Sequence, residues 1–180
     1  MLKLAKRGEN MIRKALIKDL ESLMEIISDA KRLLKNSGSL QWNLDDGYPN
    51  KENILNDIIN DVLYLYEENK TIIGMIAICG HDENYDEING KWLTNKPYLS
   101  LHRIAVKEGY HNQNIGSKLI RFAEDFAVLN HIYSIKVDTH KLNIPMQKIL
   151  TKNGYTYCGI VVLKRTKEDN LRVAYEKTVG

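Results

Sequence analysis

One strand–turn–helix pattern constrains the fold of this chain more than any other feature. An apolar run, YLSLHRIAV at residues 98–106, leads into the polar segment GYHNQNIGSKL at residues 109–119. From Ile115 onward, apolar residues recur at the three- and four-residue spacing of an amphipathic helix. Such a connection points the unpaired N–H groups of the helix start at the turn, where phosphate is the usual ligand. The segment therefore predicts an anion site or, in the simpler interpretation, an ordinary strand–helix connection.

The residues of this turn suit a phosphate ligand. Gly116 allows close approach of the backbone, and Asn114 belongs to the few non-glycine residue types that tolerate a positive φ. Gln113, Ser117 and Lys118 are further candidate donors. Two other nucleotide-binding motifs are excluded, because neither the Gly-x-x-x-x-Gly-Lys-Ser/Thr of a P-loop nor the G-x-G-x-x-G dinucleotide fingerprint is present.

The rest of the chain alternates strand-like and helix-like segments without a linker or an internal repeat. Strands are expected near residue 11, as a hairpin within 61–80, and at 98–106, 133–139, 155–162 and 172–177. Helices are expected at 19–34, 51–60, 115–130 and 144–154. This order predicts an α/β (α+β) fold with a mixed, mostly antiparallel sheet of six to seven strands flanked by helices. Residues 1–10 are expected to be an extension that does not pack, and residues 11–180 a single domain.

Composition restricts the partners and the compartment. The 180 residues are 43 % hydrophobic and 27 % charged, which suits one globular domain. A net charge of +3 is too small to indicate nucleic acid or a membrane surface as partner. Cys79 and Cys158 offer neither a metal-ligand spacing nor a disulfide framework, which fits a reducing cytoplasm. Since no segment resembles a signal peptide or reaches the about 20 apolar residues of a membrane span, a cytoplasmic protein is expected.

Together with its surroundings, the turn resembles that of the GNAT superfamily of N-acetyltransferases. In that family a strand end leads into a turn of pattern Gln/Arg-x-x-Gly-x-Gly/Ala, which opens the helix that holds the pyrophosphate of acetyl-CoA. Here HNQNIG occupies the turn, with His111 at the Gln/Arg position and Asn114 at the first Gly. Further along, Asn143 and the KNGY segment at residues 152–155 match a helix-starting Asn and a Lys-x-Gly-Phe/Tyr segment of the family. The element order agrees over nearly the whole chain, which implies the GNAT acyl-CoA N-acyltransferase fold.

The resemblance implies acetyl-CoA as co-substrate and no metal. The backbone of residues 104–106 is expected to pair with the pantetheine arm and to polarise the thioester carbonyl. The residues implied in binding acetyl-CoA are Ile104, Ala105, Val106, His111, Asn112, Gln113, Asn114, Ile115, Gly116, Ser117, Asn143, Met146 and Lys152.

Acetyl transfer to an amine needs a proton acceptor, because a free alkylamine has a pKa of about 10.4. His102, close to the strand end, is the first candidate, since a histidine side chain ordinarily titrates near neutrality. A buried, hydrogen-bonded structural histidine is the alternative. His140 is a second candidate for the same proton relay. Where many family members place a Tyr that acts as general acid, this chain has Leu150. Either Tyr157 or His140 protonates the leaving thiolate, or the thiolate departs unassisted.

The loop after the first helix is expected to contact the acceptor. Gln41, Trp42, Asp46 and Tyr48 combine an acidic residue with aromatic rings, a set that holds a cationic amine by charge and cation–π contact. A packed cover over the core is the alternative. The charged run at residues 82–87 is expected to be a solvated loop.

These features lead to one main hypothesis and two rivals. The main one is an acetyl-CoA-dependent N-acetyltransferase that transfers an acetyl group to a primary amine of a small molecule or peptide by direct attack in a ternary complex. A non-catalytic acyl-CoA-binding or regulatory module is the first rival, and a structural interaction domain without cofactor is the second. The expected partners are acetyl-CoA and an amine acceptor, with no nucleic acid and no membrane, and a homodimer is left open.

Overall fold

The computed structural model describes residues 11–180, so the expected extension at residues 1–10 lies outside the described residues. The strands are β1 (Met11–Lys14), β2 (Leu63–Glu68), β3 (Thr71–Cys79), β4 (Asn89–Gly90), β5 (Leu99–Val106), β6 (Ser134–Thr139), β7 (Thr156–Val162) and β8 (Leu171–Thr178). The helices are α1 (Leu20–Asn36), α2 (Lys51–Ile59), α3 (Ile115–Leu129) and α4 (Ile144–Lys152), with short 3-10 turns η1 (Ile17–Asp19) and η2 (Glu83–Tyr85).

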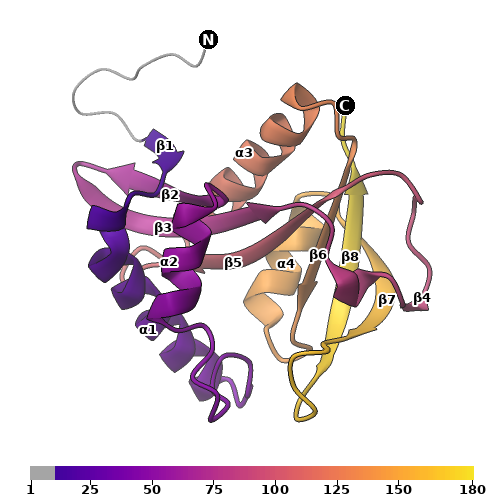
Figure 1. Ribbon diagram of the computed structural model, residues 1–180, viewed down its shortest axis with the longest axis horizontal. Helices are drawn as coiled ribbons and strands as arrows, with labels where there is room; N and C mark the ends of the chain where they lie inside the picture. Colours follow the sequence, from indigo (N-terminus) through magenta and orange to yellow (C-terminus); the bar gives the residue numbers. More distant parts are fainter. Residues whose placement is uncertain (1–10) are drawn as a thin grey trace.

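The eight strands form one sheet in the order β1-β2-β3-β5-β6-β8-β7-β4 (Figure 1). Every neighbouring pair is antiparallel except β5 and β6. The predicted α/β class with a mostly antiparallel sheet is confirmed. The additional strand is β4, whose two residues are too few to produce an alternating pattern in the sequence.

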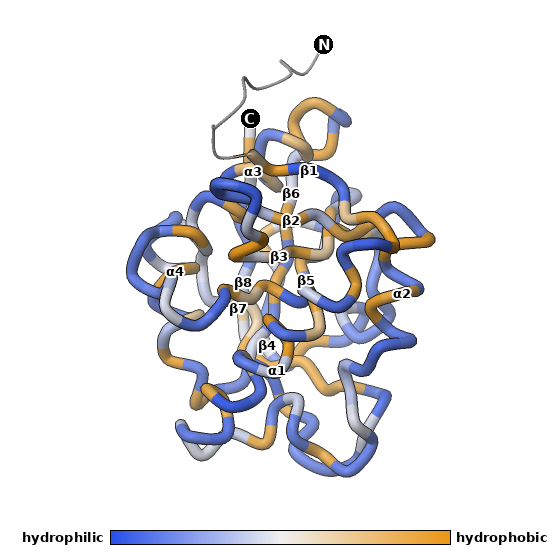
Figure 2. The backbone as a smooth tube through the Cα atoms, turned by 90° about the vertical axis from the view of Figure 1, so that its left-hand side faces the viewer, coloured by the Kyte–Doolittle hydropathy of each residue, from blue (hydrophilic) through white to orange (hydrophobic). Residues whose placement is uncertain are grey.

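Helices cover both faces of the sheet, with α1 and α2 on one face and α3 on the other. Figure 2 shows the strands in the middle, with α4 on one side and α2 on the opposite side. Each face has its own core: Leu23, Ile27 and Ile54 pack beneath α1 and α2, while Leu119 and Leu150 belong to the core under α3 and α4. No helix within residues 11–180 is long and apolar enough to cross a membrane.

The helix starts follow from local capping residues. At α2, the Asn50 side chain accepts a hydrogen bond from the Asn53 N–H at 3.0 Å, and the Asn53 side chain accepts one from the Asn50 N–H at 2.9 Å. At α4, Asn143 Oδ1 accepts a hydrogen bond from the Met146 N–H at 3.3 Å, and Pro145 occupies the first turn. Asn143 Nδ2 also donates to Thr139 Oγ1 at 3.1 Å, which ties the start of α4 to the end of β6.

The single parallel pair, β5 and β6, separates part-way along its length. Backbone pairing extends only from Leu99–Ile135 to Leu101–Val137, although β5 continues to Val106 and β6 to Thr139. Beyond this point each strand has a row of backbone groups without a strand neighbour on that side. The divergence opens the centre of the sheet, and the site lies there.

Candidate active site

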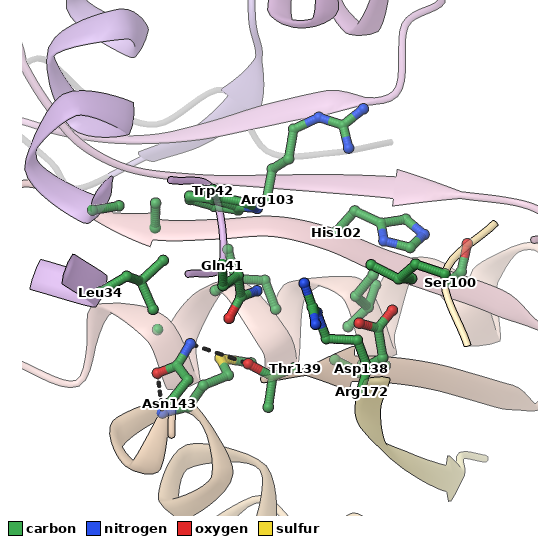
Figure 3. Close-up of a pocket in the computed structure, with 18 of the residues that line it drawn as sticks. Leu34, Gln41, Trp42, Ser100, His102, Arg103, Asp138, Thr139, Asn143 and Arg172 are labelled. Carbon is green, nitrogen blue, oxygen red and sulfur yellow. Dashed lines mark hydrogen bonds between the residues drawn. The ribbon is translucent and has the colours of Figure 1, made fainter. Parts of the chain in front are cut away.

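A cavity of about 500 Å³ lies where β5 and β6 separate. Its walls come from both strands, from the loop after α1, from the loop after β3 and from the starts of α3 and α4. In Figure 3 His102, Asp138 and Arg172 lie toward one end of the cavity, while Leu34 and Asn143 lie toward the other. The site is therefore a cleft through the sheet with two chemically different ends.

A β-bulge shapes β5 beside the cavity. His102 is paired with Ala77, whereas Ala105 is paired with Met75, so residues 103–104 lie opposite a single residue of β3. His102, Arg103 and Ile104 all line the cavity at this irregularity.

Arg103 is the bulged residue and has a φ of 51°, in the left-handed region. Its side chain turns away from Arg172 and Asp138 in Figure 3 and reaches α2, where Nη2 donates to Asp57 Oδ1 at 2.8 Å. Nη1 donates to the Tyr48 hydroxyl at 3.1 Å. Both partners are part-buried, so this ion pair ties α2 and the loop before it to the bulge.

His102 contacts a carboxylate from the loop after β3. Its Nε2 lies 3.1 Å from Asp82 Oδ2, and the side chains are only 22 % and 16 % exposed. Asp82 Oδ1 also accepts a hydrogen bond from the Asn84 N–H at 2.8 Å. Burial opposes ionisation of Asp82, but the hydrogen bonds from His102 and Asn84 prevail and lower its pKa to about 2. The carboxylate is ionised at neutral pH and positioned to hold the His102 ring.

Asp138 faces the same end of the cavity from β6. Its Oδ2 accepts a hydrogen bond of 2.7 Å from the hydroxyl of Tyr85, which is buried. Burial raises the pKa of the Asp138 carboxyl, against the lowering influence of His102, the Tyr85 hydrogen bond and Arg172. In Figure 3 the carboxylate points toward His102, and Arg172 faces the same end of the cavity.

The turn before α3 has the backbone geometry of a ligand cradle. Asn114 adopts φ 60° and ψ 18°, the left-handed conformation usually supplied by glycine, and its Oδ1 accepts a hydrogen bond from Lys152 Nζ at 3.0 Å. Within residues 11–180, no side chain caps the first N–H groups of α3. His111 and Gly116 line the cavity, and His111 Nε2 lies 3.1 Å from the Val106 carbonyl oxygen. The free N–H groups and the dipole of α3 thus face a region open to an anionic ligand.

Comparison with known proteins decides the family. The sequence model of the acetyltransferase (GNAT) family matches residues 20–155. The chain is also similar to a GNAT-family acetyltransferase from Streptococcus agalactiae of known crystal structure, with 32 % identity over 99 % of each chain and a TM-score of 0.86. The chain belongs to the GNAT acetyltransferase family. Acetyl-CoA-dependent acetyl transfer is the general activity of this family, and its fold binds acetyl-CoA and an acceptor.

More distant relatives share part of the sequence or the fold. Streptothricin acetyltransferase from Escherichia coli is 27 % identical over 74 residues, which are 41 % of this chain and 41 % of that protein. The chain spans less than half the length of the curated relatives that it matches. The PaiA N-acetyltransferase of Thermoplasma acidophilum, solved in complex with coenzyme A, has the same fold, with a TM-score of 0.67 at 22 % identity over 94 % of this chain and 99 % of that chain.

In this GNAT member, the residues predicted to bind acetyl-CoA fall into three groups. Those that line the cavity are Ile104, Ala105, Val106, His111, Gly116, Asn143 and Met146. Those exposed in the turn or beside it are Asn112, Gln113, Asn114 and Lys152. Ile115 and Ser117 are buried, Ile115 in the core under α3, and Ser117 Oγ accepts a hydrogen bond from Asn153 Nδ2 at 2.9 Å. For Ile115, whose side chain is apolar, only the backbone N–H group can donate to a ligand.

The other predicted proton-transfer groups of this GNAT member do not line the cavity. His140 is 3 % exposed, with Nε2 at 2.8 Å from Asp169 Oδ1 and Nδ1 accepting a hydrogen bond from the Leu142 N–H at 3.1 Å. Tyr157 is 55 % exposed on β7 and packs edge-on against Tyr175. Neither is brought together with His102.

An apolar core residue occupies the position at which many family members have a Tyr as general acid. Leu150 is fully buried in the core under α3 and α4. It lies outside the cavity lining and has no ionisable group. No proton donor for the thiolate is therefore supplied from this position of α4.

Three of the four predicted acceptor residues line the cavity, namely Gln41, Trp42 and Tyr48. The fourth, Asp46, does not; its carboxylate forms an ion pair with Arg165, whose guanidinium lies 4.0 Å from the centre of the Tyr48 ring. The expected acidic contact for an amine is thus already engaged by a cation of the chain.

The acidic groups that reach the cavity are instead Asp82, Glu83 and Asp138. The expectation of a solvated loop at residues 82–87 holds for Glu83, Asp86 and Glu87 but is wrong for Asp82 and the buried Tyr85. Asp138 was not identified from the sequence; an acidic residue near the end of a largely buried strand, as in SIKVDT of β6, is the signal that could have indicated it. Arg172 has no comparable signal, because its place depends on β8 lying beside β6.

Proposed function

We propose that this protein is an N-acetyltransferase that acetylates a primary amine by direct attack on acetyl-CoA, with His102 as general base and Asp82 as its positioning partner. The contact of His102 with the ionised Asp82, at the point where β5 and β6 separate, carries the proposal. The carboxylate holds the ring in place and stabilises the imidazolium that forms when the amine gives up its proton. We further propose that residues 11–180 form a single domain.

The chemistry requires little from the other side chains. The amine nitrogen attacks the thioester carbonyl carbon, the new C–N bond forms, the C–S bond breaks, and a proton of the amine passes to His102. The backbone of residues 104–106 would hold the pantetheine arm along the unpaired side of β5, and the start of α3 would hold the pyrophosphate. Since Leu150, His140 and Tyr157 supply no acid to the cavity, the thiolate, with a pKa of about 8.5, would leave unassisted and take its proton from solvent.

The test is release of free CoA over a panel of amino acids, polyamines, aminoglycosides and peptides, with acetyl-CoA saturating. Turnover that saturates with at least one amine is expected. The substitution His102→Ala should then lower kcat by about 100-fold or more, while acetyl-CoA affinity changes little. An unchanged kcat, where chemistry limits the rate, would remove His102 from the proposal.

Two controls separate the rival functions. Acetyl-CoA at about 100 times its dissociation constant should stabilise the fold by about 2.7 kcal/mol, whether or not the protein is a catalyst. Such a shift without turnover on any amine of the panel would favour the acyl-CoA-binding or regulatory module. The absence of both would favour a structural interaction domain.

A further inference from the structure

Arg172 is a buried cation that faces the cavity without a carboxylate partner. Its side chain lines the cavity, yet the residue is only 2 % exposed. Nη1 donates to the carbonyl oxygens of Asp169 and Leu171, at 2.5 and 2.8 Å. Among residues 11–180, no carboxylate lies within ion-pair distance of Arg172, and its Nε and Nη2 have no hydrogen-bond acceptor.

A guanidinium in this position is costly unless something pairs with it. Burial lowers the pKa of Arg172, and only the more distant charges of Asp138 and Asp169 oppose that effect. Arginine nevertheless stays charged in proteins, and its planar set of donors matches the two oxygens of a carboxylate. The free edge of Arg172 is therefore suited to a carboxylate that arrives with a ligand.

The groups near Arg172 suit an amine and not a carboxylate. His102 and Asp138 lie at the same end of the cavity as Arg172, and in Figure 3 their polar atoms point toward one another. Asp138 is an acceptor for an ammonium group, and His102 is the proposed base. A ligand that occupies this end thus meets one cation and two proton acceptors within a short span, which suits an amine and a carboxylate borne on the same or neighbouring carbon atoms.

We propose that the acceptor is a free amino acid, or another small molecule with a carboxylate beside its amine, and that Arg172 binds that carboxylate. The proposal rests on the proposed acetyltransferase function and specifies its substrate class. The cavity of about 500 Å³ must also admit the acetylated end of acetyl-CoA, which limits the acceptor to a small molecule. The phosphates of acetyl-CoA are expected at the start of α3, lined by His111 and Gly116, and not at Arg172.

The test compares matched acceptors that differ only in the carboxylate. Lysine is paired with cadaverine, leucine with isoamylamine and phenylalanine with phenethylamine, and the amino-acid amides serve as a third set. For at least one pair, kcat/KM of the wild-type protein should be about 10- to 100-fold higher with the amino acid, the range expected for a charge-assisted pair. Equal values within every pair that is acetylated would overturn the carboxylate proposal and leave the acetyltransferase function standing. No turnover with any of these compounds would overturn the carboxylate proposal, and the wider amine panel would decide the function itself.

Variants of Arg172 assign the preference to this residue. Arg172→Gln should raise KM for the preferred amino acid about 10-fold or more, with little effect on its decarboxylated partner or on acetyl-CoA affinity, and Arg172→Lys should restore part of the preference. Arg121→Gln, at an exposed arginine of α3, is the matched control and should behave as wild type. A folded Arg172→Gln protein that loses both acceptors equally, or loses acetyl-CoA binding, would overturn the assignment. If Arg172→Gln does not fold, the assignment is decided by Arg172→Lys. Its preference for the amino acid over the decarboxylated partner should be smaller than that of the wild type, and an unchanged preference would overturn the assignment.

Discussion

His102 Nε2 lies 3.1 Å from Asp82 Oδ2, and this contact joins β5 to the loop after β3 at the edge of the cavity. The Asp82 carboxylate can stabilise a positive charge on the ring during proton transfer, whereas a neutral amide cannot. We expect Asp82→Asn to lower kcat by about 10- to 100-fold, less than the loss of a general base itself. Acetyl-CoA affinity, measured by calorimetry, should remain within a factor of two or so of wild type.

The control for this prediction is Glu87→Gln, which removes an exposed carboxylate from the same loop. It should leave kcat unchanged, so that a general effect of loop charge is separated from the contact with His102. Equal activity of Asp82→Asn and wild type would show that Asp82 does not assist the base.

The same carboxylate should contribute to stability in a defined pH range. The pKa of Asp82 is about 2 in the folded protein, below the ordinary value of 3.8. A carboxyl whose pKa is lowered by folding stabilises the folded state above its unfolded pKa, and the contribution is lost as the pH falls toward the folded pKa. The free energy of unfolding should therefore exceed that of Asp82→Asn by on the order of 1 kcal/mol at pH 6, and the difference should shrink between about pH 4 and pH 2. Urea titrations across this range measure it, and a difference that is constant with pH would contradict the assigned pKa.

The turn before α3 gives a prediction about backbone conformation. Asn114 is left-handed at φ 60°, so Asn114→Gly should preserve the turn and Asn114→Val should strain it by about 1–2 kcal/mol. Both variants lose the hydrogen bond from Lys152, so their comparison isolates the backbone. Acetyl-CoA affinity should be near wild type for the glycine variant and clearly lower for the valine variant. Equal affinities would mean that this conformation is not needed for binding.

The fold was predictable from the sequence because its main signals are local. The apolar stripe of α1, the polar turn between the apolar runs of β2 and β3, and the capping residues Asn50 and Asn143 each determine an element within a few residues of chain. The position of Asn114 before α3 could also be recognised, because few residue types tolerate its conformation.

The polar end of the cavity was predicted only in part, since its members meet through long-range pairing. Asp138 and Arg172 come together because β6 and β8 are neighbours in the sheet, with Asp138 opposite Ala174. Asp82 reaches His102 because the loop after β3 folds back over β5. The charge and spacing of residues along the chain do not predict these long-range pairings. The sequence therefore identified His102 but not the residues that surround it.

The strand that the sequence did not reveal leads to the last prediction. Gly90 of β4 and Gly159 of β7 are paired, at φ 145° and φ 142°. A Cβ on Gly159 would overlap the Asn89 carbonyl oxygen, and both positions lie in a region that L-residues rarely adopt. Gly159→Ala should therefore detach β4 from the sheet edge.

Detachment of β4 should also disturb the active site, because β4 holds the loop after β3 that carries Asp82 and Tyr85. Tyr85 packs against Val161 of β7 and donates a hydrogen bond to Asp138, while Asp82 at the start of the same loop contacts His102. We expect Gly159→Ala to cost about 1–3 kcal/mol of stability and also to lower kcat. Gly38→Ala is the matched control, because Gly38 has φ 78° but open space around its Cβ position at the end of α1. It should lose some stability with no change in kcat. If both variants lose stability and neither loses activity, the pairing of β4 with β7 does not hold the catalytic contacts in place.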